Sequence, residues 1–152
     1  MKNALALSAF ASTIMLASVT PVTAASNPLE VRDVLELTVL AMKGDQQKTL
    51  AMLNRGTAVL RHDDLYVYCA DAQGRVVAGL PTMIGRDFAE LKDKTGKEFG
   101  RYVLANASEG EFGFTGYYLP KPGGSEEFYK EDYFTKIGDL TCGAGYYSTK
   151  TE

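Results

Sequence analysis

A change of hydrophobic pattern near residue 65 constrains the fold more than any other feature of the sequence. Before it, two segments carry apolar side chains at the three- and four-residue spacing of helices. After it, short segments rich in aromatic and β-branched residues alternate with turns that contain Gly, Pro or Asp, which is typical of antiparallel strands. We predict helices over 29–43, 46–53 and 97–107, a helical turn within 86–93, and strands over 65–70, 75–78, 111–119, 127–137 and 140–147.

This order of elements predicts a single α+β domain. Five strands joined mostly by hairpins and interrupted by one helical segment favour an antiparallel sheet with helices packed on one side. Asn27-Pro28 would cap the first helix and supply its first-turn proline. The chain has 152 residues, the length of one domain, and its 45% hydrophobic and 23% charged residues are ordinary proportions for a globular protein.

The N-terminus has the pattern of a secretory signal peptide. A positively charged start precedes an apolar stretch over 4–19, and the small residues at 22–24 suit cleavage by signal peptidase after residue 24. An uncleaved membrane anchor is the alternative, because the stretch approaches the length that spans a bilayer. Pro21 and the small residues behind it favour cleavage. We therefore expect residues 1–24 to be a signal peptide and residues 25–152 to be one domain that is periplasmic or secreted.

Charge argues against a nucleic-acid partner. The net charge is −3, and removal of Lys2 with the signal peptide makes it one unit more negative. Lysine and arginine are not clustered along the sequence, whereas phosphate binding needs a concentrated basic surface. We expect no binding of nucleic acid.

The two cysteines, Cys69 and Cys142, favour one disulfide in an oxidising compartment. Two buried free thiols that act as small apolar residues are the alternative. Two cysteines without a CxxC or CxxCH motif exclude a zinc cluster and a covalently attached c-type haem.

Catalysis has little support in the sequence. His62 is the only histidine, and its polar surroundings before the first main strand indicate a solvated loop residue rather than a base or a metal ligand. The acidic pairs at 126–127 and 131–132 are typical of solvated surfaces. We expect no enzyme, no metal and no cofactor, and a metal- or haem-assisted enzyme that uses His62 is the weakest hypothesis.

Tyrosine is the residue type that stands out. The chain has nine tyrosines, of which Tyr102 lies on a predicted helix and the others on predicted strands. An apolar ring with a hydroxyl tip suits a small pocket that orients a polar ligand. Ordinary aromatic packing on a sheet is the alternative. Lys130 is a candidate cation for a carboxylate ligand, or else an edge-strand lysine that prevents aggregation.

Seven segments, taken in order, carry a resemblance to a known family. They are YVY (66–68), DAQGRVVA (71–78), IGRDF (84–88), LKDKTGKEF (91–99), GFTGYYLP (113–120), KEDYFTKIGD (130–139) and GAGYY (143–147). Together they resemble the single Cache domain family over residues 27–148. The resemblance implies an extracytoplasmic sensor with a PAS-like fold, in which a long N-terminal helix packs on a five-stranded antiparallel sheet. It also implies a pocket between the sheet and the segments that join strands two and three, and small ligands, often short-chain carboxylates such as acetate, propionate, lactate or pyruvate.

The resemblance implies roles for individual residues. Lys130 is the expected carboxylate partner, and Tyr117 and Tyr133 are expected hydroxyl donors or pocket walls. Because Lys130 and Tyr133 are three positions apart, a regular strand places them on opposite faces unless a bulge intervenes. The weaker candidates are Tyr68, Arg86 and Tyr102.

The same resemblance bears on the cysteines and on ligand identity. In a PAS-like sheet the first and last strands are neighbours, which would bring Cys69 and Cys142 opposite each other. The family often has His where Gly79-Leu80 stands and Trp at the positions of Leu119 and Leu140. These differences change the pocket, so the identity of the ligand does not carry over from the family.

We expect a free-standing exported domain that binds a small organic ligand and passes its state to a membrane receptor. The alternative is a non-catalytic interaction or structural module with a vestigial pocket, which dimerises through its N-terminal helix.

Overall fold

The computed structural model describes residues 27–56, 61–62 and 64–148. The expected signal peptide, residues 1–24, lies outside this part of the chain. Within the described ranges, no helix has both the length and the apolar character that crossing a membrane requires.

Two consecutive helices, α1 (Pro28–Gly44) and α2 (Gln46–Arg55), open the described structure. The side chain of Asn27 accepts hydrogen bonds from the first-turn amides of α1, and Pro28 occupies the first turn, where its missing N–H costs nothing. Asp45 joins the two helices, because its backbone N–H bonds to Ala41 at the end of α1 while its carboxylate caps α2. Both predicted helices and the predicted cap are confirmed.

The sheet is antiparallel and consists of β1 (Arg61–His62), β2 (Leu65–Ala70), β3 (Val76–Ala78), β4 (Gly113–Pro120), β5 (Glu127–Ile137) and β6 (Leu140–Tyr147). The order is β1-β2-β6-β5-β4, and β3 also pairs with β2. The first long strand therefore lies beside the last, as in PAS-like α+β folds.

The short strand β1 corrects the sequence prediction, which treated residues 61–62 as part of a loop. Two polar residues give no period-two pattern, and only pairing with Leu65 and Tyr66 of β2 makes them a strand. The side chain of His62 lies outside the described part of the structure.

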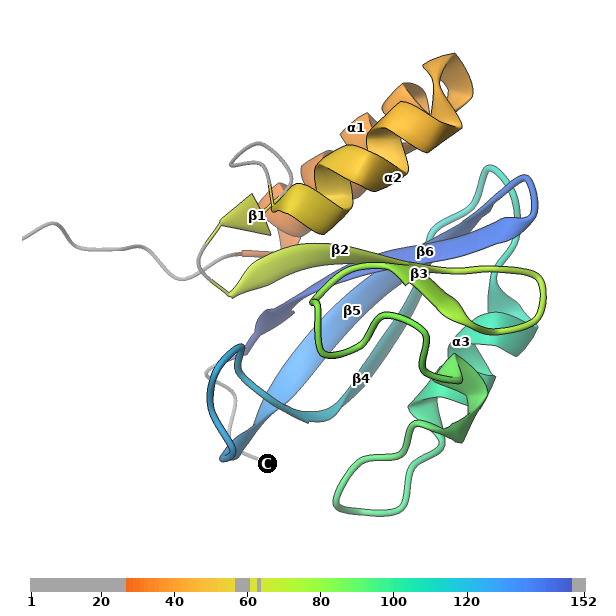
Figure 1. The fold of residues 1–152 in the computed structure, drawn as a ribbon. Coiled ribbons are helices and arrows are strands. Elements are labelled where there is room, and N and C mark those ends of the chain that lie inside the picture. Colours follow the sequence, from red (N-terminus) through yellow and green to blue (C-terminus); the bar gives the residue numbers. More distant parts are fainter. Residues whose placement is uncertain (1–26, 57–60, 63, 149–152) are drawn as a thin grey trace, which may run out of the picture.

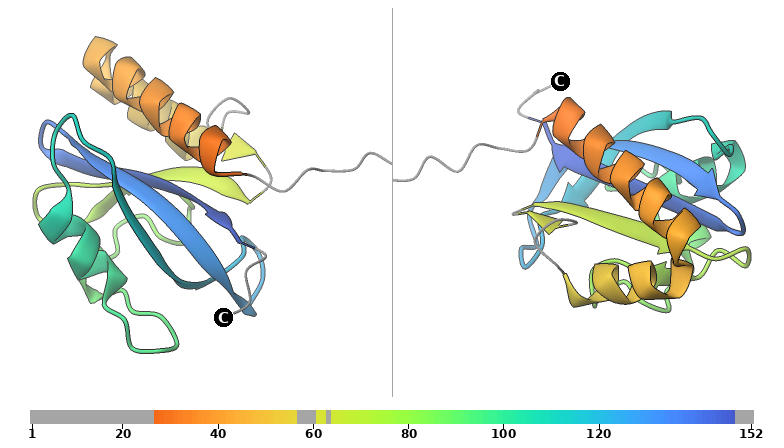
Figure 2. Two further views of the ribbon diagram at one scale, coloured as in Figure 1. Left: turned by 180° about the vertical axis from the view of Figure 1, so that it is seen from behind. Right: turned by 90° about the horizontal axis from the view of Figure 1, so that it is seen from above.

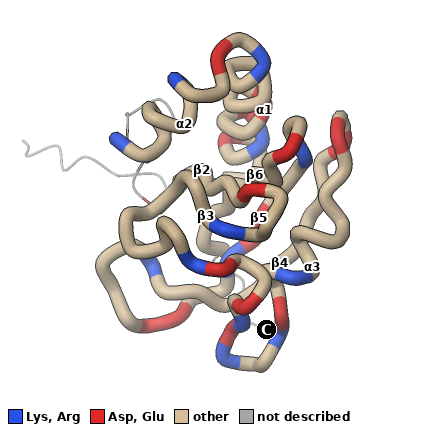
Figure 3. The backbone as a smooth tube through the Cα atoms, turned by 45° about the vertical axis from the view of Figure 1, so that its right-hand side comes forward, with Lys and Arg blue, Asp and Glu red and all other residues tan. Residues whose placement is uncertain are grey.

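Helices cover both faces of the sheet, which corrects the prediction that they pack on one side. Helices α1 and α2 lie along one face, and α3 (Phe99–Asn106) with the 3₁₀ turn Phe88–Glu90 lies against the other (Figures 1 and 2). We call these the α1 face and the α3 face. Lys and Arg are interspersed with Asp and Glu over the described backbone rather than gathered in one region (Figure 3).

Each face of the sheet has its own apolar core, since successive side chains of a strand point to opposite sides. On the α1 face, Val31 and Leu35 pack against alternate residues of β2 and β6. On the α3 face, Phe88, Phe99 and Val103 pack with the alternate residues of β2, Tyr68 and Ala70. Every residue of β6 is buried, so this strand is covered on both faces.

A disulfide joins Cys69 of β2 to Cys142 of β6. The two residues are register partners in the antiparallel pair, and both side chains are fully buried on the α1 face. The predicted disulfide is present, and it ties the first long strand to the last across 73 positions of sequence.

Replacing both cysteines with alanine should lower the free energy of unfolding by about 4 kcal/mol, because the oxidised chain closes a long loop in the unfolded state. Urea unfolding of the oxidised wild type, the reduced wild type and the double variant measures this. The reduced wild type should resemble the double variant, whereas unfolding midpoints that are equal in all three would contradict a structural disulfide.

Candidate functional site

The central strand β5 carries two ionisable side chains on the α3 face. Lys130 and Asp132 are two positions apart, so they share a face, and both are 0% exposed. The pairing of β5 with β4 and β6 runs without a register shift along this segment. No bulge re-aims Tyr133, which therefore lies on the α1 face beside Phe114.

Four tyrosines from the neighbouring strands surround these two side chains. Lys130 is the register partner of Tyr117 on β4 and of Tyr147 on β6. Tyr66 and Tyr68 belong to β2, one strand further away, on the same face. We call this group the Lys130 cluster, and its members are Lys130, Asp132, Tyr66, Tyr68, Tyr117 and Tyr147.

Two glycines of β6 make room for the cluster. Tyr68 extends across Gly143, because its hydroxyl and ring occupy the space that a Cβ of this residue would fill. A Cβ on Gly145 would lie 2.6 Å from Cε of Lys130 and 2.8 Å from Oδ1 of Asp132. Side chains from β2 and β5 can therefore meet above β6 only because these two positions lack side chains.

Asp132 accepts hydrogen bonds inside the cluster. The hydroxyl of Tyr68 donates to Oδ2 of Asp132 at 2.6 Å, and the hydroxyl of Tyr117 also hydrogen-bonds to this carboxylate. Oδ1 is buried and has no hydrogen-bond partner. Burial raises the pKa of Asp132 to about 6, and Lys130 and the two hydroxyls offset part of that rise.

Lys130 is a buried cation without a hydrogen bond. Its Nζ lies 3.8 Å from the ring centroid of Tyr66 and 5.4 Å from that of Tyr147, in cation–π contacts. Burial lowers the pKa of Lys130, and the charge of Asp132 opposes this change. Because β5 lies between β4 and β6, the interpretation of Lys130 as an edge-strand lysine is wrong.

Aromatic rings fill most of the space between the cluster and α3. The ring of Phe99 stacks on Tyr117 at 3.9 Å, and Phe88 stacks on Tyr68 at 4.9 Å between centroids. The cavity that remains beside Tyr66, Tyr68 and Tyr117 has a volume of about 20 Å³. That volume holds about one water molecule.

The structure brings together three of the six ligand-binding residues expected from the sequence, Lys130, Tyr117 and Tyr68. Tyr133 lies on the other face. Arg86 is an exposed residue of the segment after β3, where its guanidinium contacts Met83. Tyr102 of α3 is 45% exposed, and its ring packs edge-on against Phe134, which is not a member of the cluster.

Sequence reasoning missed Asp132, Tyr66 and Tyr147. The acidic pair at 131–132 was expected to be solvated, and this is wrong for both residues. Glu131 is 6% exposed on the α1 face, where it accepts a hydrogen bond from Tyr146. The spacing of Lys130 and Asp132 on a predicted strand was the available signal, because residues two apart share a face.

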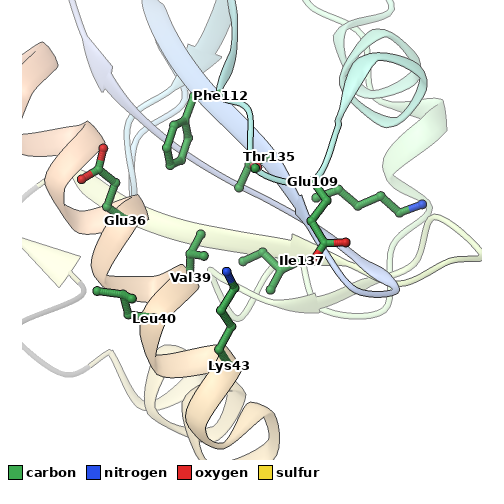
Figure 4. Close-up of a pocket in the computed structure, with 10 residues that line it drawn as sticks. Glu36, Val39, Leu40, Lys43, Glu109, Phe112, Thr135 and Ile137 are labelled. Atoms are coloured by element: carbon green, nitrogen blue, oxygen red, sulfur yellow. The ribbon is translucent and has the colours of Figure 1, made fainter.

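A second hollow, the α1 groove, lies on the opposite face of the sheet (Figure 4). Its volume is about 270 Å³, and Val39 and Leu40 of α1 line it together with Phe112 and Ile137. It contains none of the six expected ligand-binding residues. Nowhere in the described chain do three or more His, Cys, Asp or Glu side chains form a group that could hold a metal ion.

Comparisons with known proteins agree with this architecture. A family model described as Single Cache domain 2 matches residues 38–142. A methyl-accepting chemotaxis protein from Vibrio parahaemolyticus has a similar structure, with a TM-score of 0.65 and 22% identity over 78% of this chain and 86% of that one. No curated protein matches the sequence.

Two further solved structures are similar at a TM-score of 0.55. One is a periplasmic sensor domain of a chemotaxis protein, with 24% identity over 76% of this chain and 86% of that one. The other comes from work on carboxylic acid recognition by a Cache chemosensory domain, with 21% identity over 76% of this chain and 84% of that one. At these identities the structural matches show a shared fold.

Asp132 should make stability depend on pH in a defined direction. Since its pKa is higher in the folded state than the ordinary 3.8, folding favours the protonated form, and this group destabilises the protein as pH rises through 4 to 6. Lowering the pH from 7 to 5 should therefore raise the free energy of unfolding by about 1 kcal/mol more in the wild type than in Asp132→Asn. Urea unfolding of both proteins at both pH values measures this difference. An equal response of wild type and Asp132→Asn would contradict the assignment.

Proposed function

The chain belongs to the Single Cache domain 2 family, and from this premise we propose that it is an exported sensor domain whose Lys130 cluster binds a short-chain carboxylate or a similarly small metabolite. Cache domains of this kind are sensors and are non-catalytic. The proposal includes residues 1–24 as a cleaved signal peptide and residues 25–152 as the mature domain. The buried disulfide supports an oxidising compartment outside the cytoplasm.

The observation that carries the proposal is the buried ammonium of Lys130, which has no hydrogen-bond partner. Burial of a charged group is unfavourable unless the group is paired and hydrogen-bonded. A carboxylate would supply a charge-assisted hydrogen bond, which is among the strongest that an ammonium can form. The recognition of carboxylic acids by a similar Cache domain supports the same chemistry.

The size of the cavity limits the ligand. A volume of about 20 Å³ admits a molecule of several heavy atoms only if a side chain moves. Tyr66 is the side chain whose movement would open the site, because its ring covers Lys130. Acids with two to four carbons are therefore better candidates than longer chains, and the ligand would replace the ring of Tyr66 as the partner of the ammonium.

A screen of short carboxylic acids by thermal shift tests this function. An acid present at one hundred times its dissociation constant should raise the free energy of unfolding by about 2.7 kcal/mol. Lys130→Met should abolish the shift while still folding, because methionine is apolar and of similar length. Lys136→Met, a change of an exposed lysine on the same strand, is the matched control and should keep it. Shifts that survive in Lys130→Met, or the absence of any shift in the wild type, would refute the proposal.

A second candidate function is a non-catalytic interaction module with a vestigial pocket, which acts through dimerisation or through a membrane receptor. The stacked rings that fill the α3 face support it, as do three leucines of α1 that are exposed. These are Leu29 at 75%, Leu37 at 50% and Leu40 at 66%. Apolar residues exposed in a row along one helix are typical of a contact surface.

Under this second function, Leu37→Glu with Leu40→Glu should convert a self-associating protein to a monomer that is still folded and whose melting temperature no longer depends on protein concentration. Sedimentation velocity across a range of concentrations measures the change. Ile84→Glu alters an exposed apolar residue away from α1, 43% exposed, and should leave association unchanged. A wild type that is monomeric throughout would exclude dimerisation through α1.

A further inference from the structure

Three of the four tyrosine hydroxyls of the Lys130 cluster already donate to the protein itself. A phenolic hydroxyl has one proton to donate. Tyr68 directs its proton to Asp132, and Tyr117 also hydrogen-bonds to that carboxylate. Tyr147 donates to the backbone carbonyl of Pro120 at 2.6 Å. These three side chains therefore offer a ligand lone pairs rather than protons.

Asp132 adds another acceptor to the same site. Its Oδ1 is buried without a hydrogen-bond partner, although the side chain is otherwise well held. Oδ1 and the Cε of Lys130 both lie within 3 Å of one point above Gly145, the position that a Cβ of this residue would take. The ammonium is held over the ring of Tyr66 instead of hydrogen-bonding to the carboxylate. The unpaired cation and the unpaired acceptor are thus neighbours.

A simple carboxylate would satisfy only half of this site. It would pair with Lys130, but it would place a second anion near Asp132 and leave Oδ1 without a donor. A buried acceptor that stays unpaired costs about 1–3 kcal/mol. A ligand that brings its own donor would remove this cost and turn the repulsion into a hydrogen bond.

We propose that the ligand of the Lys130 cluster is a small acid with a hydrogen-bond donor on the carbon next to its carboxylate, so that the carboxylate binds Lys130 and the donor binds Oδ1 of Asp132. This inference rests on the proposed function and narrows it. The shared chemistry fits both a 2-hydroxy acid and a 2-amino acid. The carboxylate of either acid would pair with Lys130. An amino acid would then offer Asp132 a positively charged donor, whereas a hydroxy acid would offer it a neutral one.

Four acids with three carbons test the inference on the full mature domain. Lactate carries a hydroxyl, alanine an ammonium, pyruvate only an acceptor, and propionate neither. Isothermal titration should show lactate or alanine binding at least about ten-fold more tightly than propionate and pyruvate, since a tenfold change corresponds to the lower part of the cost of an unpaired acceptor. Whichever of the two binds more tightly identifies the donor as a hydroxyl or an ammonium.

Two variants test whether Asp132 causes the preference for an acid that carries a donor. Asp132→Asn removes the anionic acceptor and should reduce the preference for the donor-bearing acid to less than about three-fold. Glu131→Gln changes the neighbouring acid on the α1 face and should preserve it. The comparison of the four acids uses the wild type, so it remains decisive even if Asp132→Asn does not fold.

The outcomes separate this inference from the function on which it rests. If propionate or pyruvate binds as tightly as lactate and alanine, and Lys130→Met abolishes that binding, the carboxylate function stands and the donor inference is wrong. A preference that survives in a folded Asp132→Asn also overturns the inference. If none of the acids binds, the proposed function fails as well.

Discussion

The pairing of β2 with β6 is the constraint on which both faces of the molecule depend. It places Cys69 opposite Cys142 on the α1 face, where the disulfide fixes the two strands together. One residue earlier along β2, on the other face, it places Tyr68 opposite Gly143. Because that glycine has no side chain, the phenol ring crosses β6 and reaches Asp132 on the next strand. A slip of one residue would break the covalent link and the polar cluster together.

The cluster and the disulfide act on stability in opposite directions. Burial of Asp132 and Lys130 disfavours their charged forms, as the raised pKa of the acid and the lowered pKa of the base indicate. A buried ionic pair is seldom the most stable filling for a core, and apolar residues of similar volume are often at least as good. The disulfide stabilises the same strand pair by limiting the unfolded chain. This arrangement lets the sheet tolerate buried polar groups that packing alone would not retain.

The local pattern of apolar and turn residues predicted most of the helices and strands. Strands 65–70, 127–137 and 140–147 have the predicted bounds, because aromatic and β-branched runs end at clear turns there. The site was harder to predict. Lys130 and the strand tyrosines were candidates from the sequence itself, and the family resemblance pointed to Tyr68 and Tyr117 among them. Asp132 was missed because adjacent acids normally lie on surfaces. Asp132 is buried because Gly145 stands opposite it on β6 and leaves room for the tyrosine rings of the cluster. The sequence alone does not show which residues of distant strands face each other.

The structure also changes the role of the tyrosines. From the sequence, their hydroxyls were expected to donate to a carboxylate ligand. In the fold, Tyr68 and Tyr117 hydrogen-bond to a carboxylate that the protein itself supplies. Asp132 therefore accepts the hydrogen bonds that the tyrosines would otherwise donate to a ligand. Lys130 remains as the buried donor that has no hydrogen-bond partner. Under the proposed function, the side chains that hold Asp132 in place leave its Oδ1 as the acceptor for a donor on the ligand, and they would act on specificity without touching the ligand's carboxylate.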